Sequence, residues 1–170
     1  MRRLLPTLLA AALAAIFSTG AGATGAASYA DTISGYEYFA TSTDGDFAGT
    51  ASGALPGAWT ISVRHARLCL SCTPTATIGG GSVTLVSRLG GGPALIRGTF
   101  ASGTVQVTNP GAGCTNQTFS VNGVLRGVGP SGRRTGSGTF SATLTHHRKH
   151  LLGRCITYAA SVTGKLSVTF

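Results

Sequence analysis

Apolar residues alternate with small polar residues along most of the chain after residue 31. In the stretch 59–64, for example, tryptophan, isoleucine and valine take every second position, with threonine, serine and arginine between them. A period of two that includes β-branched residues is typical of half-buried β-strands. Because no run shows helical spacing, we predict an all-β domain. The expected strands lie at 32–41, 59–64, 82–85, 96–100, 104–108, 118–122, 140–145 and 155–170.

Short segments rich in glycine, proline and asparagine separate these runs and predict tight turns. They are Asp44-Gly45, Pro56-Gly57, Gly79-Gly80-Gly81, Gly90-Gly91-Gly92-Pro93, Asn109-Pro110-Gly111, Asn122-Gly123 and Pro130-Ser131-Gly132. Short connections favour antiparallel pairing of neighbouring strands. We therefore predict an antiparallel up-and-down meander of about eight strands that closes into a barrel, with a two-sheet β-sandwich as the alternative. Closure would remove exposed strand edges, and glycines would let the strands bend around a tight barrel.

The first residues have the three-part layout of a secretory signal peptide. A basic start is followed by an apolar stretch over 4–17, which is shorter than the ~20 residues that span a bilayer, and then by small residues. We expect cleavage after Ala23, with Ala30 as the alternative, and a secreted, extracellular protein. The predicted division is a signal peptide over 1–23, a short linker over 24–30 and a single β domain over 31–170.

Charge is unevenly distributed along the chain. Lysine and arginine total 13 against four acids, a net charge of +9, and without Arg2 and Arg3 the balance is 11 to four, or +7. The four acids all precede Phe47, and they are Asp31, Glu37, Asp44 and Asp46. A catalytic triad, a glycosidase pair or a calcium site would have to draw its carboxylates from this first part, which disfavours all three. The unbalanced cations predict an anionic partner such as a polymer, a cell wall or a membrane surface.

Four cysteines form an even set, which predicts disulfides in an exported chain. Of the three connectivities we favour Cys69–Cys72 with Cys114–Cys155, and the second bridge would close a loop of about 40 residues. A redox motif built on Cys69 and Cys72 would need a helix N-terminus, which the pattern does not predict. A zinc site would need two histidines in addition to these two cysteines. We therefore predict no metal site and no cofactor.

Two segments, 59–67 and 140–148, share a layout at an offset of 81 residues. Each carries an aromatic residue, two apolar residues, a histidine and an arginine at every second position. The histidines therefore continue rows of buried residues and are expected at the rim of the barrel, where ligands often bind. Arginines beside them would suit an anionic head group. The candidate ligand-binding residues are Trp59, His65, Arg67, His146 and Arg148.

A second candidate region is the cationic segment around 146–150, which we place on a predicted hairpin. Such a tip would contact a phosphate-rich polymer, nucleic acid or an anionic membrane, with binding that weakens as salt rises. Aromatic residues are too sparse here for base stacking, so sequence-specific recognition of nucleic acid is not predicted. The candidate residues for polyanion contact are Arg133, Arg134, His147, Lys149, His150 and Arg154.

Glycine-rich strands with one tryptophan near the start are similar to small secreted ligand barrels of the avidin or lipocalin kind. Since the similarity covers only the strand rhythm, no functional residue is carried over from it. The favoured function is an extracellular binding module for an anionic or amphiphilic ligand or surface. One alternative is a small secreted enzyme with a histidine pair at the barrel mouth, although no nucleophile motif is present. The other is a structural envelope or outer-membrane barrel, suggested by the terminal Phe170 and disfavoured by polar strand faces. The oligomeric state is left open.

Overall fold

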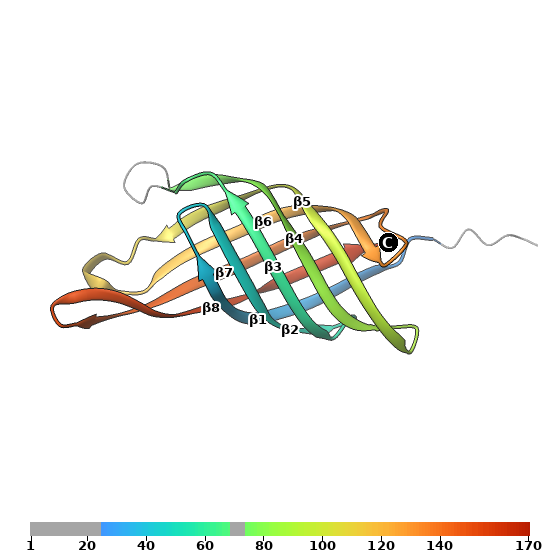
Figure 1. Ribbon diagram of the computed structural model, residues 1–170, viewed down its shortest axis with the longest axis horizontal. Helices are drawn as coiled ribbons and strands as arrows, with labels where there is room; N and C mark the ends of the chain where they lie inside the picture. Colours follow the sequence, from blue (N-terminus) through green and yellow to red (C-terminus); the bar gives the residue numbers. More distant parts are fainter. Residues whose placement is uncertain (1–24, 69–73) are drawn as a thin grey trace, which may run out of the picture.

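The computed structural model describes residues 25–68 and 74–170, which form an eight-stranded antiparallel β-barrel (Figure 1). Each strand pairs with its neighbours in sequence, and β1 pairs with β8 to close the sheet. This confirms the predicted up-and-down barrel over the alternative sandwich. The elements are β1 Ser28–Ala40, β2 Asp44–Gly53, β3 Gly57–His65, β4 Thr75–Leu89, β5 Gly92–Asn109, the short 3₁₀ segment η1 Ala112–Cys114, β6 Gln117–Pro130, β7 Gly136–Leu151 and β8 Arg154–Thr169.

The predicted signal peptide over 1–23 and the favoured Cys69–Cys72 bridge lie outside the described residues. Strand β1 begins at Ser28, inside the range 24–30 that we expected to be a linker. Its first residues pair with the end of β8, and the Tyr29 ring stacks on Phe170 with ring centroids 5.0 Å apart. Cleavage after Ala30 would remove these contacts.

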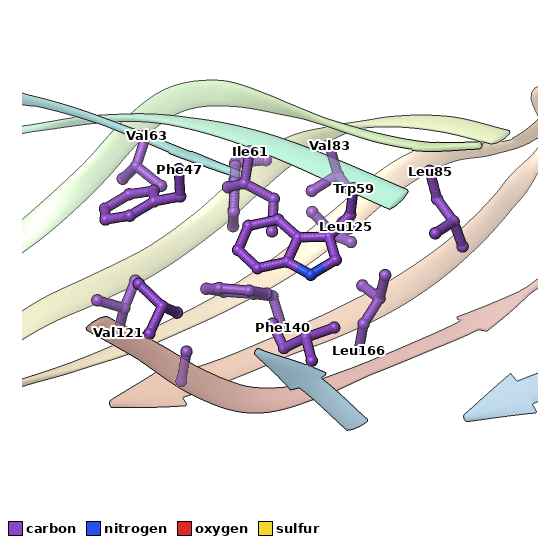
Figure 2. Close-up of a cluster of buried hydrophobic side chains, with 14 of the residues drawn as sticks. Phe47, Trp59, Ile61, Val63, Val83, Leu85, Val121, Leu125, Phe140 and Leu166 are labelled. Carbon is purple, nitrogen blue, oxygen red and sulfur yellow. The ribbon is translucent and has the colours of Figure 1, made fainter. Parts of the chain in front are cut away.

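The interior of the barrel is filled by the apolar positions of the alternating pattern. In β3 the side chains of Trp59, Ile61 and Val63 are buried, and in β7 those of Phe140 and Leu144 are buried. Figure 2 shows side chains from opposite walls meeting around Trp59. The residues between them on each strand face outward, as the period of two requires. The labelled members of this core are Phe47, Trp59, Ile61, Val63, Val83, Leu85, Val121, Leu125, Phe140 and Leu166.

The predicted strand count was right, but two strand assignments were wrong. The runs 96–100 and 104–108 belong to one strand, β5, and strand β2 was not predicted at all. Strand β2 reads DGDFAGTASG, so only Phe47 and Ala51 give its inward face an apolar signal among small and polar residues. Asp44-Gly45, taken as a turn, is the start of this strand.

Two glycine-containing segments predicted as turns lie inside strands. Gly79-Gly80-Gly81 is part of β4 and Asn122-Gly123 is part of β6. At Gly123 the reason is space, because a Cβ atom there would collide with the ring of Phe100 on the neighbouring strand β5. Gly123 thus marks a close approach of an aromatic ring rather than a reversal of the chain.

One end of the barrel is closed by the loop between β2 and β3. Leu55 in this loop is buried, and its backbone N–H donates a hydrogen bond of 2.8 Å to Oδ1 of the buried Asp31. The Ser87 hydroxyl donates a bond of 2.8 Å to the Pro56 carbonyl and holds the same loop. The opposite end, where β1, β3, β5 and β7 finish, carries the candidate site. Across the described ranges no helix has the length and apolar character needed to cross a membrane.

Candidate functional site

A cavity of about 200 Å³ opens at the barrel mouth. Its floor is apolar and its rim is polar, so the two parts would contact different portions of a ligand. A cavity of about 150 Å³ can hold a molecule as large as benzene, which indicates room for one small organic ligand. The apolar lining includes Phe47, Val63, Leu68, Val105, Phe119, Val121 and Leu144. The polar lining includes Glu37, Thr41, Ser42, Asp44, His65, Gln117 and His146.

A carboxylate–imidazole pair forms one side of the cavity. His146 Nε2 lies 2.7 Å from Glu37 Oε2, although the two residues are 109 positions apart in sequence. The exposed fractions of the two side chains are 8% for Glu37 and 19% for His146, so the pair is largely shielded from water. A hydrogen bond from Nε2–H to an ionised carboxylate leaves Nδ1 of a neutral imidazole as an acceptor. The ring of Phe119 lies 5.0 Å from the imidazole and packs beside it.

Strand β1 directs Glu37 into the cavity, because Glu37 continues the inward row of Asp31, Ile33 and Gly35 at every second position. The register between β1 and β2 shifts only after it, between Glu37 and Phe39, so the bulge alters the end of the strand beyond Glu37. Gly45 on β2 provides the room, because a Cβ atom there would lie 3.1 Å from Glu37 Oε1 and 2.7 Å from the Phe47 ring. The position of the Glu37 carboxylate therefore depends on the absence of a side chain at Gly45.

A second carboxylate, Asp44, lies on the cavity rim. The Thr43 and Thr41 hydroxyls donate hydrogen bonds of 2.7 and 3.1 Å to its Oδ2 atom and lower the pKa of Asp44. Arg64, 4.0 Å away and largely exposed, adds a smaller effect in the same direction. His65 lines the same cavity and its Nδ1 lies 2.8 Å from the Ala66 carbonyl. The mouth thus combines two carboxylates with two imidazoles.

The structure brings together two of the five predicted ligand-binding residues. His65 and His146 both line the cavity, at the ends of the two repeated rows. Trp59 is buried deeper in the core, and its Nε1–H donates to the Thr50 carbonyl at 2.9 Å. Arg67 is exposed beyond the end of β3, and Arg148 donates to the Gly111 carbonyl at 2.9 Å. Neither arginine lines the cavity.

The sequence interpretation missed Glu37 and Asp44 as site residues. A signal was available, since these are two of only four acids in the chain and they flank the segment 38–43. Strand parity was a second signal, because Glu37 lies in the same alternating row as Asp31 and Ile33, both of which are buried.

The predicted polyanion contacts do not form one surface. Lys149, His150 and Arg154 are exposed on the β7–β8 hairpin, near the mouth. Arg133 and Arg134 lie in the β6–β7 turn at the other end of the 16-residue strand β7, a separation of about 50 Å along the strand. His147 is half-buried, with Nε2 2.8 Å from the Ser161 hydroxyl.

The predicted Cys114–Cys155 disulfide is confirmed. Its sulfur atoms are 2.02 Å apart and its Cα atoms 5.6 Å apart. The bridge joins the loop between β5 and β6 to the start of β8, and so fixes the projecting β7–β8 hairpin beside the mouth. A structural disulfide is compatible with an extracellular location.

No protein-family model, curated protein or solved structure matches this chain. The fold and site alone define the class, which is a closed eight-stranded antiparallel barrel with a small cavity at a partly polar mouth. Within residues 25–68 and 74–170, no group of three or more His, Cys, Asp and Glu side chains is arranged to hold a metal ion.

Proposed function

We propose that this protein binds a small amphiphilic molecule outside the cell, with the apolar part of the ligand in the barrel mouth. The observation that carries the proposal is the cavity of about 200 Å³, whose floor is built from aromatic and branched aliphatic side chains. Each methylene group buried there contributes about 0.8 kcal/mol, so even a short alkyl chain provides affinity. Polar groups lie at the rim, which is the arrangement expected of a pocket that orients its ligand.

The electrostatics of the rim favour a head group that is cationic or donates hydrogen bonds. The carboxylates of Glu37 and Asp44 both line the cavity, and the cations of the neighbouring hairpin do not. Since Glu37 is shielded from solvent, its attraction for a cation is screened less than that of a surface acid. This part of the proposal keeps the amphiphilic ligand of the sequence-based expectation but replaces its anionic head group by an amine or hydroxyl head.

The polar residues on the outer wall of the barrel support the proposal that this surface faces water. Outward positions on β7 and β8 carry residues such as Thr143, Lys165 and Ser167. Buried in lipid, their hydroxyl and ammonium groups would lack hydrogen-bond partners, which is costly. The outer-membrane alternative is therefore not the proposal that we pursue.

The proposal is tested with three probes of equal chain length: hexylamine, hexanol and hexanoate. We expect the wild-type protein to bind the amine most tightly and the carboxylate least, as measured by chemical-shift titration. Val105→Trp should weaken binding of all three by about tenfold or more, because the indole occupies the space of at least two ligand methylenes. Glu37→Gln should reduce the preference for the amine.

Val86→Trp serves as the matched control, because Val86 is an exposed residue on β4 that does not line the cavity. It should bind the probes as the wild type does. The proposal would be wrong if the wild type bound none of the three probes. It would also be wrong if Val105→Trp bound them as tightly as the wild type does.

A second candidate function, acid–base catalysis, is favoured by the Glu37–His146 pair. A carboxylate that orients an imidazole leaves the other ring nitrogen able to accept a proton from water or a substrate hydroxyl. We expect, under this alternative, that p-nitrophenyl butyrate is hydrolysed and that His146→Gln lowers kcat/KM by about 100-fold. His147→Gln is the control, since His147 does not line the cavity. Equal hydrolysis by wild type and His146→Gln would exclude this function.

A further inference from the structure

The β7–β8 hairpin extends beyond the barrel wall (Figure 1). Strand β7 pairs with β6 only as far as His146, and β8 pairs with β1 only from Ser161 onward. The residues between them form a two-stranded ribbon that reaches about 17 Å past His146. A ribbon of this kind is marginally stable alone, and here the Cys114–Cys155 bridge and the Arg148–Gly111 hydrogen bond support it.

The tip of this ribbon exposes leucine in an unfavourable backbone conformation. Leu152 is 95% exposed and has φ 50°, and Gly153 follows with φ 75°. Two-residue turns with positive φ at both positions favour Asn-Gly or Asp-Gly, because a leucine side chain is strained in the left-handed region. Leucine at this position is therefore unfavourable both for the turn conformation and for contact with water. We infer that a partner buries its side chain.

The exposed apolar residues of the described ranges are concentrated at this end. Of eight exposed large hydrophobic side chains, six belong to the end of β1 and to the hairpin. The two groups adjoin, because Tyr36 pairs with Ser161, whose hydroxyl contacts His147, and His147 packs near Tyr158. The six are Tyr36, Tyr38, Phe39, Leu151, Leu152 and Tyr158.

Cations flank the leucines at the tip. Lys149 lies over the Tyr158 ring with its Nζ 4.9 Å from the centroid, and Leu151 pairs with Arg154 across the ribbon. Paired residues project from the same face of a sheet, so Lys149, Leu151 and Arg154 share one face. The sequence has no acid after Asp46, so the ribbon itself carries no carboxylate side chain. Leucine at the apex, with cations and a tyrosine behind it, matches the order of a lipid surface, in which the acyl chains lie beneath the head-group layer that holds the phosphates and favours tyrosine.

We propose that the β7–β8 hairpin docks the protein onto an anionic lipid bilayer. Leu151 and Leu152 enter the boundary between head groups and acyl chains, and Lys149 and Arg154 contact lipid phosphates. A soluble polyanion would form ion pairs with the cations but would leave the leucines exposed to water. The two leucines at the apex therefore favour a membrane over a polymer. This inference does not depend on the cavity ligand, although docking would turn the barrel mouth toward the bilayer.

The test is co-sedimentation with phosphatidylcholine vesicles prepared with and without phosphatidylglycerol. We expect binding to the vesicles that contain phosphatidylglycerol, and weaker binding as salt rises. Leu152→Asn should lower the partition coefficient by about tenfold, since a buried leucine side chain is lost. Because asparagine suits the left-handed turn, this variant should fold at least as stably as the wild type. Lys149→Gln with Arg154→Gln should lower binding about fivefold for each cation removed.

Val86→Thr is the matched control, because it removes an exposed apolar residue on β4, away from the hairpin, and should leave vesicle binding unchanged. The proposal is overturned if the wild type ignores vesicles containing phosphatidylglycerol, or if Leu152→Asn binds them as the wild type does. Retention on heparin that is insensitive to Leu152→Asn, without vesicle binding, would instead identify an anionic polymer as the partner.

Discussion

Replacing Trp59 by alanine is expected to lower the free energy of unfolding by about 3–5 kcal/mol, the range for large aromatic residues in cores. Trp59 is 1% exposed and lies at the centre of the packed interior (Figure 2). Its ring lies against Gly35 of β1, where a Cβ atom would approach it to 2.8 Å. Because glycine has no side chain, Gly35 cannot fill the space that the indole leaves on this wall of the barrel.

The measurement is guanidinium unfolding followed by far-UV circular dichroism. Tryptophan fluorescence cannot be used, because Trp59 is the single tryptophan of the chain and the variants lack it. Trp59→Phe is the comparison variant, since it keeps an aromatic ring but loses the hydrogen bond to the Thr50 carbonyl. It should lower the free energy of unfolding by less than Trp59→Ala does. The cavity does not include Trp59, so Trp59→Phe should bind hexylamine as the wild type does. A loss below about 1 kcal/mol for the alanine variant would contradict the central packing role.

Removing the Cys114–Cys155 bridge is expected to cost about 4 kcal/mol of unfolding free energy. The two cysteines are 41 positions apart, and in the chain-entropy model closing a loop of that length restricts the unfolded chain by this amount. The paired change Cys114→Ser with Cys155→Ser avoids leaving a free thiol. Urea unfolding of this variant and of the wild type provides the comparison.

The control for the bridge is Cys69→Ser with Cys72→Ser. A bridge between those two residues stays a prediction, and its loop would be so short that its removal should cost less. The Cys114/Cys155 variant should also bind phosphatidylglycerol vesicles more weakly, because the ribbon that carries Leu152 loses its attachment to the β5–β6 loop. An unchanged urea midpoint for the Cys114/Cys155 variant would refute the entropic argument.

Cavity and hairpin lie at the same end of the barrel but have opposite charge. Glu37 and Asp44 are on the cavity side, whereas Lys149 and Arg154 are on the projecting ribbon. A protein docked through the ribbon would present its acid-lined mouth near the lipid head groups. The two proposals therefore fit one arrangement, and the separate variants Glu37→Gln and Leu152→Asn allow each to fail alone.

Much of the candidate site could be anticipated, and its chemistry could not. The repeated rows placed His65 and His146 at the rim because parity continues along a regular strand. Arg67 and Arg148 followed the same parity, but β3 ends at His65 and β7 pairs with β6 only as far as His146. A residue beyond the barrel wall does not reach the cavity even where its parity is right, so the predicted arginine pair is not at the cavity.

The alternating pattern by itself determined the all-β class and the inward rows, because burial of every second side chain is a local property of strands. The short turns favoured a meander, and the pairing of β1 with β8 decided that it is a closed barrel and not a sandwich. The alternating pattern could not locate β2 or the full length of β5, since glycine marks both turns and close contacts. Only the tertiary structure decided that Glu37 meets His146, that Arg133 lies far from Lys149, and that Leu152 projects from the molecule. Such placements depend on strand register and bulges around a closed barrel, which are set by packing between distant residues.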